Sequence, residues 1–194
     1  MIIGITGGTG CGKTTALDAI RQLGGLVLDC DQLYHQLLQT DTALLSAIEH
    51  RFPGCVQAGK LDRKALGSIV FSDQAALRDL NTITHSAVKK AVLLELAKKP
   101  PLAAIDAIGL FEGGLADLCD ITVAITAPET VRISRLMQRD GISADYAKMR
   151  IQAQRPQDEF IALCDYHLRN DGTQQHFKEQ CLAFFRQLAI IKEN

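Results

Sequence analysis

The octapeptide GGTGCGKT, Gly7–Thr14, satisfies the pattern G-x-x-x-x-G-K-[ST]. It follows a short apolar run, Ile2–Ile5, and it opens a helical pattern that extends from Thr14 to Leu23. Glycines let the backbone curl so that successive amide N–H groups point into one concavity, and the helix N-terminus adds a partial positive charge. The stretch therefore predicts a strand, a phosphate-binding loop and a helix, which together open an α/β fold.

The side chains of this loop predict how a nucleoside triphosphate is held. We expect Lys13 to reach the β- and γ-phosphates and the Thr14 hydroxyl to bind Mg²⁺. A glycine-rich turn with an exposed lysine is the alternative, but the flanking strand and helix favour the nucleotide site. The residues expected to contact the nucleotide are Gly8, Thr9, Gly10, Cys11, Gly12, Lys13, Thr14 and Thr15.

Further apolar runs continue the pattern along the chain. Short runs bounded by glycine or proline are typical of buried strands, and helical patterns separate them. Such alternation predicts a parallel sheet covered on both faces. We therefore predict an α/β fold of the P-loop NTPase type, with a five-stranded parallel sheet flanked by helices. The five expected strands are Ile2–Ile5, Leu26–Leu28, Leu102–Ile105, Ile121–Ile125 and Tyr166–Leu168.

Two stretches interrupt the alternation. Residues 32–98 hold more helix than one crossover needs, with helices expected around residues 44–52, 66–70 and 77–91. We expect this region to build a pocket for an acceptor. Residues 128–164 contain short helices that Pro128 and Gly141 delimit and Ser143 caps, as in a lid. The sequence thus predicts one domain, 1–194, with a core formed by 1–31, 99–127 and 165–194.

Composition narrows the class of protein. The chain has 194 residues, and its 21 basic and 22 acidic side chains argue against an obligate nucleic-acid binder. Its six cysteines form no CxxC pair, which indicates free thiols in a reducing compartment. No signal peptide and no apolar stretch long enough to span a bilayer are present. We expect a cytoplasmic protein without membrane or nucleic-acid partners, and no feature specifies an oligomeric state.

A phosphate loop alone does not distinguish a regulatory switch, a motor and a small-molecule kinase. The sequence DAIG, Asp106–Gly109, fits the D-x-x-G pattern of nucleotide switches. No N-K-x-D for guanine recognition occurs, however, and the chain is too short to carry the coupling machinery of a motor. A kinase is therefore favoured, with a switch kept as the rival from another functional class.

Two acids follow the second expected strand in the sequence LVLDCDQLYHQ, Leu26–Gln36. Asp31 directly precedes a helical pattern, and Asp is a favoured N-cap residue, so capping is one interpretation. Phosphoryl transfer also needs a group that orients the attacking hydroxyl and takes its proton. Parallel strands end at one edge of a sheet, so Asp29 or Asp31 can face the phosphates. Capping and catalysis are compatible roles.

With these motifs in order, the sequence resembles the dephospho-CoA kinase family over nearly its whole length. The resemblance implies a Mg²⁺-dependent transfer of phosphate from ATP to the ribose 3′-hydroxyl of dephospho-CoA, the last step of coenzyme A synthesis. A nucleoside or nucleotide kinase of the same fold is the alternative. The stretches that carry the resemblance are GITGGTGCGKTT, LDCD, LDRKALGSIVF, LNTITHSAV, GLFEGGL, MQRDGIS, RIQAQ and LRNDG.

The resemblance also implies roles for single residues around ATP. Asp31 corresponds to the catalytic base, and Asp29 either helps to hold Mg²⁺ or ends the strand. Arg139 is implied near the ATP phosphates as a catalytic residue, with Arg135 beside it. Asn170 lies in a loop that the family places near the adenine, although before Asp-Gly it is also typical of a turn.

Other residues are implied at the acceptor. Arg63 is expected to meet a phosphate of dephospho-CoA, and His85 and Gln154 to contribute to the same pocket; His85 between helices is the alternative. Arg132 shares a helix face with Arg135 and Arg139, but we expect it on a solvated surface balanced by acids. Cys11 in the loop and Cys30 between the two acids are unusual neighbours for phosphates. A thiol at a helix N-terminus can have a lowered pKa, which suggests oxidation that ATP relieves.

The chain departs from the family pattern in two places. Ile108 and Gly109 stand where the family has proline and leucine, and Ser86 stands where it has the proline of H-P. Both departures lie near the expected acceptor pocket, and neither affects the phosphate loop or Asp31.

Overall fold

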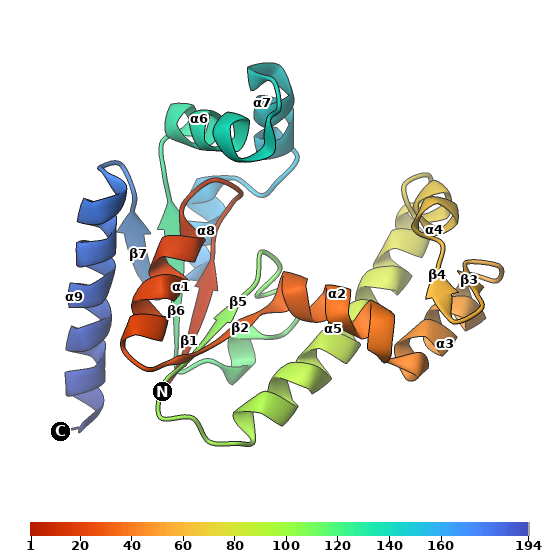
Figure 1. The fold of residues 1–194 in the computed structure, drawn as a ribbon, viewed down its shortest axis with the longest axis horizontal. Helices are drawn as coiled ribbons and strands as arrows, with labels where there is room; N and C mark the ends of the chain where they lie inside the picture. Colours follow the sequence, from red (N-terminus) through yellow and green to blue (C-terminus); the bar gives the residue numbers. More distant parts are fainter. Residues whose placement is uncertain (194) are drawn as a thin grey trace. The chain divides into compact units, whose positions relative to one another are not determined.

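The computed structural model describes residues 1–193 and shows a five-stranded sheet in the order β2-β5-β1-β6-β7 (Figure 1). Strand β1 pairs in parallel with both of its neighbours, so that Ile5 lies opposite Asp106 on one side and Val123 on the other. The predicted parallel sheet is confirmed. Its strands are β1 Ile2–Thr6, β2 Leu26–Asp29, β5 Ala103–Asp106, β6 Ile121–Thr126 and β7 Tyr166–Arg169.

The chain divides into two compact units, which are described separately. The core unit comprises residues 1–28, 100–110 and 115–194. The helical unit comprises residues 29–99 and 111–114.

The core unit is built on the buried strands. Alternating β-branched residues such as Ile3 and Ile5 are fully buried, as the short apolar run predicts. Helix α1 covers them with Ala16 and Ile20, and α9 packs against α1 (Figure 1). The helices of this unit are α1 Lys13–Gln22, η1 Ala116–Leu118, α6 Glu129–Asp140, α7 Ala144–Gln152, α8 Gln157–Leu163 and α9 Gln174–Glu193.

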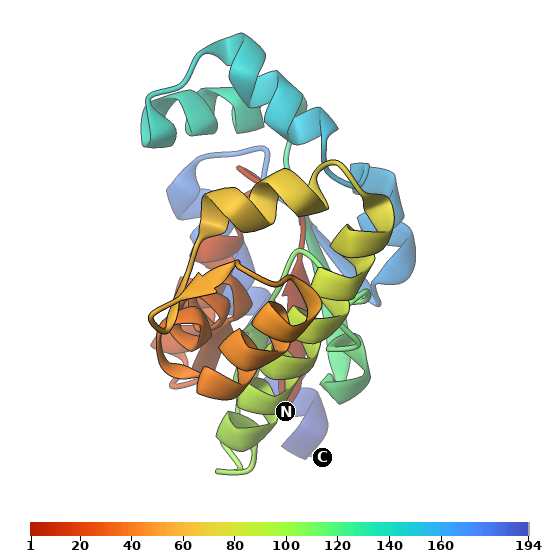
Figure 2. The ribbon, with the colours of Figure 1, turned by 90° about the vertical axis from the view of Figure 1, so that its right-hand side faces the viewer.

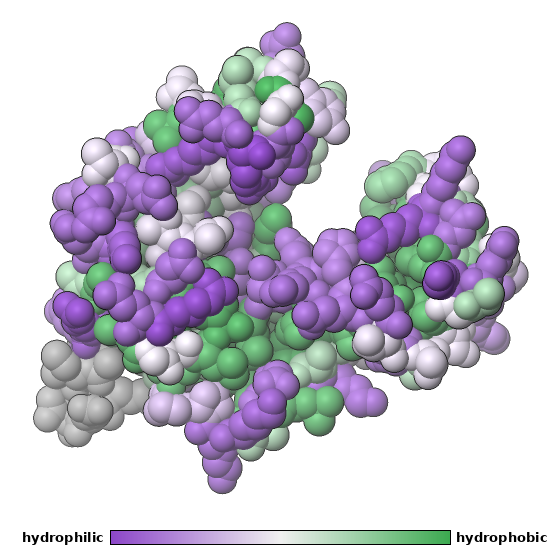
Figure 3. Space-filling model, viewed as in Figure 1, coloured by the Kyte–Doolittle hydropathy of each residue, from purple (hydrophilic) through white to green (hydrophobic). Residues whose placement is uncertain are grey.

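Helices α6 and α7 form a pair, which we call the lid pair. Figures 1 and 2 show the two helices side by side. Leu136, Ala147 and Ile151 are buried between them. Gly141 ends α6 with a φ of 65°, and Ser143 caps α7 by accepting from the Tyr146 N–H, as predicted. In the view of Figure 3 hydrophilic side chains line the lower edge of this pair.

The helical unit packs three helices against one long helix. Helix α5 contacts α2, α3 and α4, and its buried residues Leu80 and Ala76 join Phe52 and Ile48 in a separate core. Each of the four helices starts after an Asp whose carboxylate accepts from a first-turn N–H. The elements are α2 Cys30–Thr40, α3 Thr42–Arg51, β3 Val56–Gln57, β4 Lys60–Leu61, α4 Arg63–Val70 and α5 Gln74–Leu96.

The sequence patterns did not predict the short elements β3, β4, η1 and α8. The antiparallel hairpin of β3 and β4 has only two residues in each strand, too few for an alternating pattern. Helix α8 spans only Gln157–Leu163 and was not expected as a separate helix. No helix within residues 1–193 is both long and apolar enough to span a bilayer. All six cysteines carry free thiols, as expected.

Candidate active site

The phosphate loop connects β1 to α1 in a tight turn. Gly7 has a φ of 142°, and a Cβ placed there would lie 2.2 Å from the backbone oxygen of Ile125, so only glycine fits. The Lys13 Nζ donates to the Gly7 carbonyl over 2.9 Å, so the lysine at the end of the loop is bonded to the glycine at its start. Thr14 is exposed in the first turn of α1, where its hydroxyl is accessible to a ligand. The predicted strand, loop and helix are all present.

Two polar side chains hold the carbonyl groups of this loop. The Arg135 Nη1 donates to the carbonyls of Gly10 (3.2 Å) and Cys11 (3.4 Å). The Asn170 Nδ2 also donates to Cys11 (2.9 Å), and its Oδ1 accepts from Arg135 (3.0 Å). Asn170 is 2% exposed, so the amide is a buried link and not only turn chemistry. The structure therefore brings Arg135 and Asn170 to the phosphate loop; their contact with ATP stays a prediction.

Arg132 corrects an expectation. Its side chain is 3% exposed, so its placement on a solvated helix face was wrong. Its Nε donates to the Thr9 carbonyl (2.8 Å) and its Nη2 to the Oε1 of Gln154 (3.4 Å), which also accepts from the Thr9 N–H (2.7 Å). This face of α6 is covered by the loop. The shared spacing of Arg132 with Arg135 was the signal that could have identified it.

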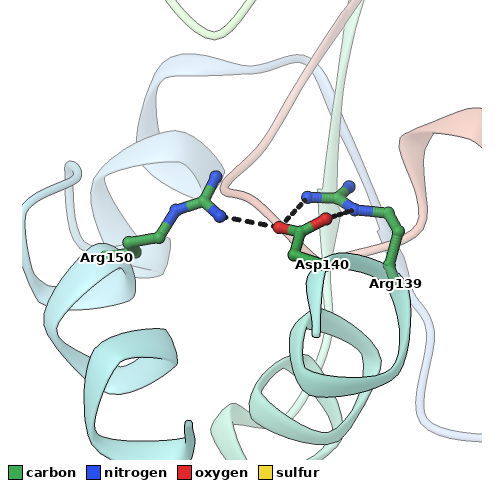
Figure 4. Close-up of polar contacts among 3 residues, drawn as sticks. All are labelled: Arg139, Asp140 and Arg150. Atoms are coloured by element: carbon green, nitrogen blue, oxygen red, sulfur yellow. Dashed lines mark hydrogen bonds and ion pairs between the residues drawn. The ribbon is translucent and has the colours of Figure 1, made fainter. Parts of the chain in front are cut away.

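Arg139 lies in the last turn of α6. It is exposed, and its Nε and Nη2 donate to the two carboxylate oxygens of Asp140 over 2.7 and 3.0 Å. Asp140 also accepts from Arg150 of α7 over 2.6 Å (Figure 4). The hydrogen bonds from Arg139, reinforced by Arg150, lower the pKa of Asp140 to about 2. The structure thus pairs Arg139 with Asp140 within α6, and Asp140 joins α6 to α7 through Arg150. The role of Arg139 at the ATP phosphates stays a prediction.

The thiol of Cys11 differs from what its position in the sequence indicates. Burial raises the pKa of Cys11 and outweighs the opposing charge of Lys13. The side chain is 1% exposed. The expectation of a lowered pKa at this helix N-terminus was therefore wrong, because desolvation of the thiolate is the larger effect.

Asp106 is an acid that the sequence predictions did not assign to this site. It ends β5 and pairs in register with Ile5, close to the start of the phosphate loop, and its charge raises the pKa of Cys11. From the sequence, Asp106 was expected only as the first residue of a D-x-x-G switch motif. Its signal was an acid at the carboxyl end of a strand. Residues 1–193 contain no cluster of three or more His, Cys, Asp or Glu side chains that could hold a metal ion.

In the helical unit, Asp29 and Asp31 have different roles. Asp29 is the N-cap of α2, and its Oδ1 accepts from the Gln32 N–H over 2.9 Å. The interpretation of Asp31 as the cap is therefore wrong. Asp31 lies in the first turn of α2 and is exposed, where the helix dipole favours its negative charge.

Two of the expected acceptor residues, Arg63 and His85, lie in the helical unit. Arg63 begins α4, and its Nη2 lies 3.3 Å from the Nδ1 of His35 on α2, a residue that sequence patterns did not identify. Burial raises the pKa of the neighbouring Tyr34, and the charge of Arg63 opposes that shift. His85 is half-buried on α5. Gln154 belongs to the core unit, where its contacts are with the phosphate loop and Arg132. The roles of these residues in acceptor binding stay predictions.

Similarity to known proteins identifies the family. The sequence model described as dephospho-CoA kinase matches residues 1–176. The dephospho-CoA kinase of Anaeromyxobacter dehalogenans is 41% identical over 177 residues, covering 88% of this chain and 84% of that protein. That of Syntrophotalea carbinolica is 34% identical, covering 97% and 92%. The solved structure of dephospho-CoA kinase from Campylobacter jejuni has a TM-score of 0.70 at 25% identity and covers 98% of both chains. This chain belongs to the dephospho-CoA kinase family.

Proposed function

We propose that this protein transfers the terminal phosphoryl group of ATP to the ribose 3′-hydroxyl of dephospho-CoA and releases CoA and ADP. The observation that carries the proposal is the phosphate loop between β1 and α1, in a chain that matches the family over residues 1–176. The free thiols are consistent with a cytoplasmic location, which is part of the proposal.

ATP is the donor in this proposal, and the phosphate loop is its binding site. The amide groups of the loop and the N-terminus of α1 supply fixed partial positive charge for the phosphates. Lys13, which donates to Gly7 in this structure, would exchange that bond for a bond to a phosphate oxygen. Arg139 would supply further positive charge as phosphate is transferred, once it leaves Asp140.

Oxygen ligands suited to Mg²⁺ are present. The exposed hydroxyl of Thr14 and the carboxylate of Asp106 both belong to the core unit, and Asp29 is a further candidate. Mg²⁺ prefers a few protein oxygens together with waters and phosphates, so this donor set fits. When bound, Mg²⁺ would neutralise charge on the phosphates.

Asp31 is the proposed base. A carboxylate that accepts a hydrogen bond from the 3′-hydroxyl aligns the attacking oxygen and receives its proton. Three features support this role: Asp29 already provides the cap of α2, Asp31 is exposed, and β2 belongs to a sheet whose parallel strands end at one edge.

The helical unit is the proposed acceptor region. Arg63 is exposed at the start of α4, where a guanidinium can bind a phosphate of dephospho-CoA. His35 lies within reach of Arg63, and we add it to the proposed set with His85.

A coupled ADP-release assay with a panel of acceptors tests the proposal. We expect Mg²⁺- and acceptor-dependent ADP release with dephospho-CoA and ATP, and little with nucleosides, nucleotides or GTP. Phosphate transfer to nucleosides or nucleotides alone would indicate a different kinase of the same fold. Preference for GTP without acceptor-dependent turnover would indicate a regulatory switch.

A further inference from the structure

We propose that Arg132 and Gln154 are positioning residues of the phosphate loop, which act through the two peptide groups that flank Thr9 to hold the loop in the form that binds ATP. The proposal rests on the proposed function only in taking ATP as the ligand of this loop.

A closed ring of hydrogen bonds carries the argument. The Arg132 Nε donates to the Thr9 carbonyl over 2.8 Å, and the Thr9 N–H donates to the Gln154 Oε1 over 2.7 Å. The Arg132 Nη2 closes the ring by donating to the same Oε1 over 3.4 Å. The backbone of Thr9 is therefore held at both its donor and its acceptor.

Because the peptide group is planar, fixing the Thr9 carbonyl also fixes the direction of the next N–H in the loop. The Thr9 carbonyl and the Gly10 N–H belong to one planar, trans peptide unit, so they point in opposite directions. Arg132 therefore fixes the direction of the Gly10 N–H. Arg135 and Asn170 hold the next carbonyls, of Gly10 and Cys11, in the same way. A carbonyl that accepts from a guanidinium is also polarised, which strengthens the opposite N–H as a donor to phosphate.

The burial of Arg132 supports a specific role. A guanidinium that is 3% exposed must be hydrogen-bonded to offset its desolvation, and its bonds here go to two neutral oxygens, of Thr9 and Gln154. A Cβ at Gly8 would lie 2.3 Å from the Arg132 Nη2. The glycine at this position thus leaves the space that the guanidinium occupies.

The ring also joins the phosphate loop to both ends of the lid pair. Arg132 lies on α6, and Gln154 follows the end of α7. The two connections to the lid pair therefore meet at one residue, Thr9: Gln154 holds the peptide group before it and Arg132 the peptide group after it.

Conservative and non-conservative variants test the proposal. Arg132→Lys keeps the charge but replaces the planar fork with one ammonium group. Gln154→Ala removes the shared acceptor, and Gln154→Glu keeps it. The controls are Arg21→Lys and Gln22→Ala, on the exposed surface of α1 in the same unit.

We expect Arg132→Lys and Gln154→Ala each to raise the dissociation constant for ATP about tenfold by calorimetry, and the double variant to do little more. Gln154→Glu and both controls should stay within about threefold of the parent. In the coupled assay the KM for ATP should rise while the KM for dephospho-CoA stays constant. Thermal unfolding midpoints identify variants that do not fold. If Arg132→Lys does not fold, the comparison of Gln154→Ala with Gln154→Glu tests the proposal.

Three results would overturn the proposal: ATP binding within about twofold of the parent in both weakened variants, Gln154→Glu as weak as Gln154→Ala, or an equal rise in both KM values. Direct binding of ATP does not depend on the acceptor. A parent that binds ATP but leaves dephospho-CoA unphosphorylated would contradict the proposed function and still test Arg132 and Gln154.

Discussion

Asp29 and Asp31 stand two positions apart and have different environments. Asp29 ends β2 and accepts from the Gln32 N–H, so its carboxylate satisfies one of the free donors of α2. Asp31 is one residue into the helix and is exposed. The helix needs only one of the two acids as its cap, which leaves Asp31 available for chemistry.

Replacing Asp31 tests the proposed base. Asp31→Asn keeps the size of the side chain but cannot accept the proton, so turnover should fall about 10²–10⁴-fold, the usual range for a general base. The dissociation constant for ATP should change little. Asp73→Asn, the same replacement at the exposed N-cap of α5, is the matched control because Asn caps a helix as well as Asp. Activity of Asp31→Asn within about threefold of the parent would refute the assignment.

At the scale of elements, short polar contacts at helix ends determine where helices start and how they are joined. The helices of the helical unit begin after Asp41, Asp62 and Asp73 as well as Asp29. In the lid pair, Asp140 at the end of α6 binds both Arg139 and Arg150 (Figure 4). Each feature gives a prediction about one element.

The cap of α2 can be measured directly. Asp29→Ala leaves the Gln32 N–H without its acceptor and should lower the free energy of unfolding by about 1 kcal/mol, whereas Asp29→Asn should retain most of it. Urea unfolding followed by circular dichroism provides the measurement. A larger loss from Asp31→Ala than from Asp29→Ala would contradict the observed cap.

The ion pair between Asp140 of α6 and Arg150 of α7 is expected to stabilise α7 locally and to add little to the global free energy of unfolding. Arg150→Ala should speed amide hydrogen exchange in α7 and leave exchange in β1 and β6 unchanged, because partly exposed ion pairs add little to global stability. Arg169→Ala removes an exposed pair with Asp171 outside the lid pair and serves as the control. Unchanged exchange in α7 would show that its contacts with α6 do not depend on Arg150.

At the scale of the whole molecule, buried thiols make stability depend on pH. Burial raises the pKa of Cys119 and Cys181 to about 12 and that of Cys164 to about 11. Unfolded thiols ionise near about pH 8.5. Between these values the folded protein keeps protons that the unfolded chain has lost, so the free energy of unfolding falls as pH rises.

We therefore expect full stability from these thiols below about pH 8.5 and a progressive loss toward pH 11–12. For the fully buried Cys181 the slope is at most about 1.4 kcal/mol per pH unit. Urea unfolding from pH 7 to pH 10 measures it, and Cys181→Ala should flatten the dependence even though it lowers stability at neutral pH. Parallel pH curves for the parent and Cys181→Ala would contradict the prediction.

The sequence by itself determined the features that depend on neighbours along the chain. Apolar runs next to glycines place the five strands because a buried strand and a tight turn are local requirements. The same holds for the phosphate loop, which needs glycines, a lysine and a helix in fixed order. The hairpin of β3 and β4 was missed because two residues are too few for a period.

Only the tertiary structure decided which side chains meet from distant parts of the chain. Arg132 was expected in solvent, yet it lies buried on Thr9, 123 residues away in the sequence. The pKa of Cys11 is raised because burial outweighs the nearby lysine. Helical periodicity shows that two residues share a face but not what covers that face, since burial and desolvation depend on the atoms that packing brings around a group.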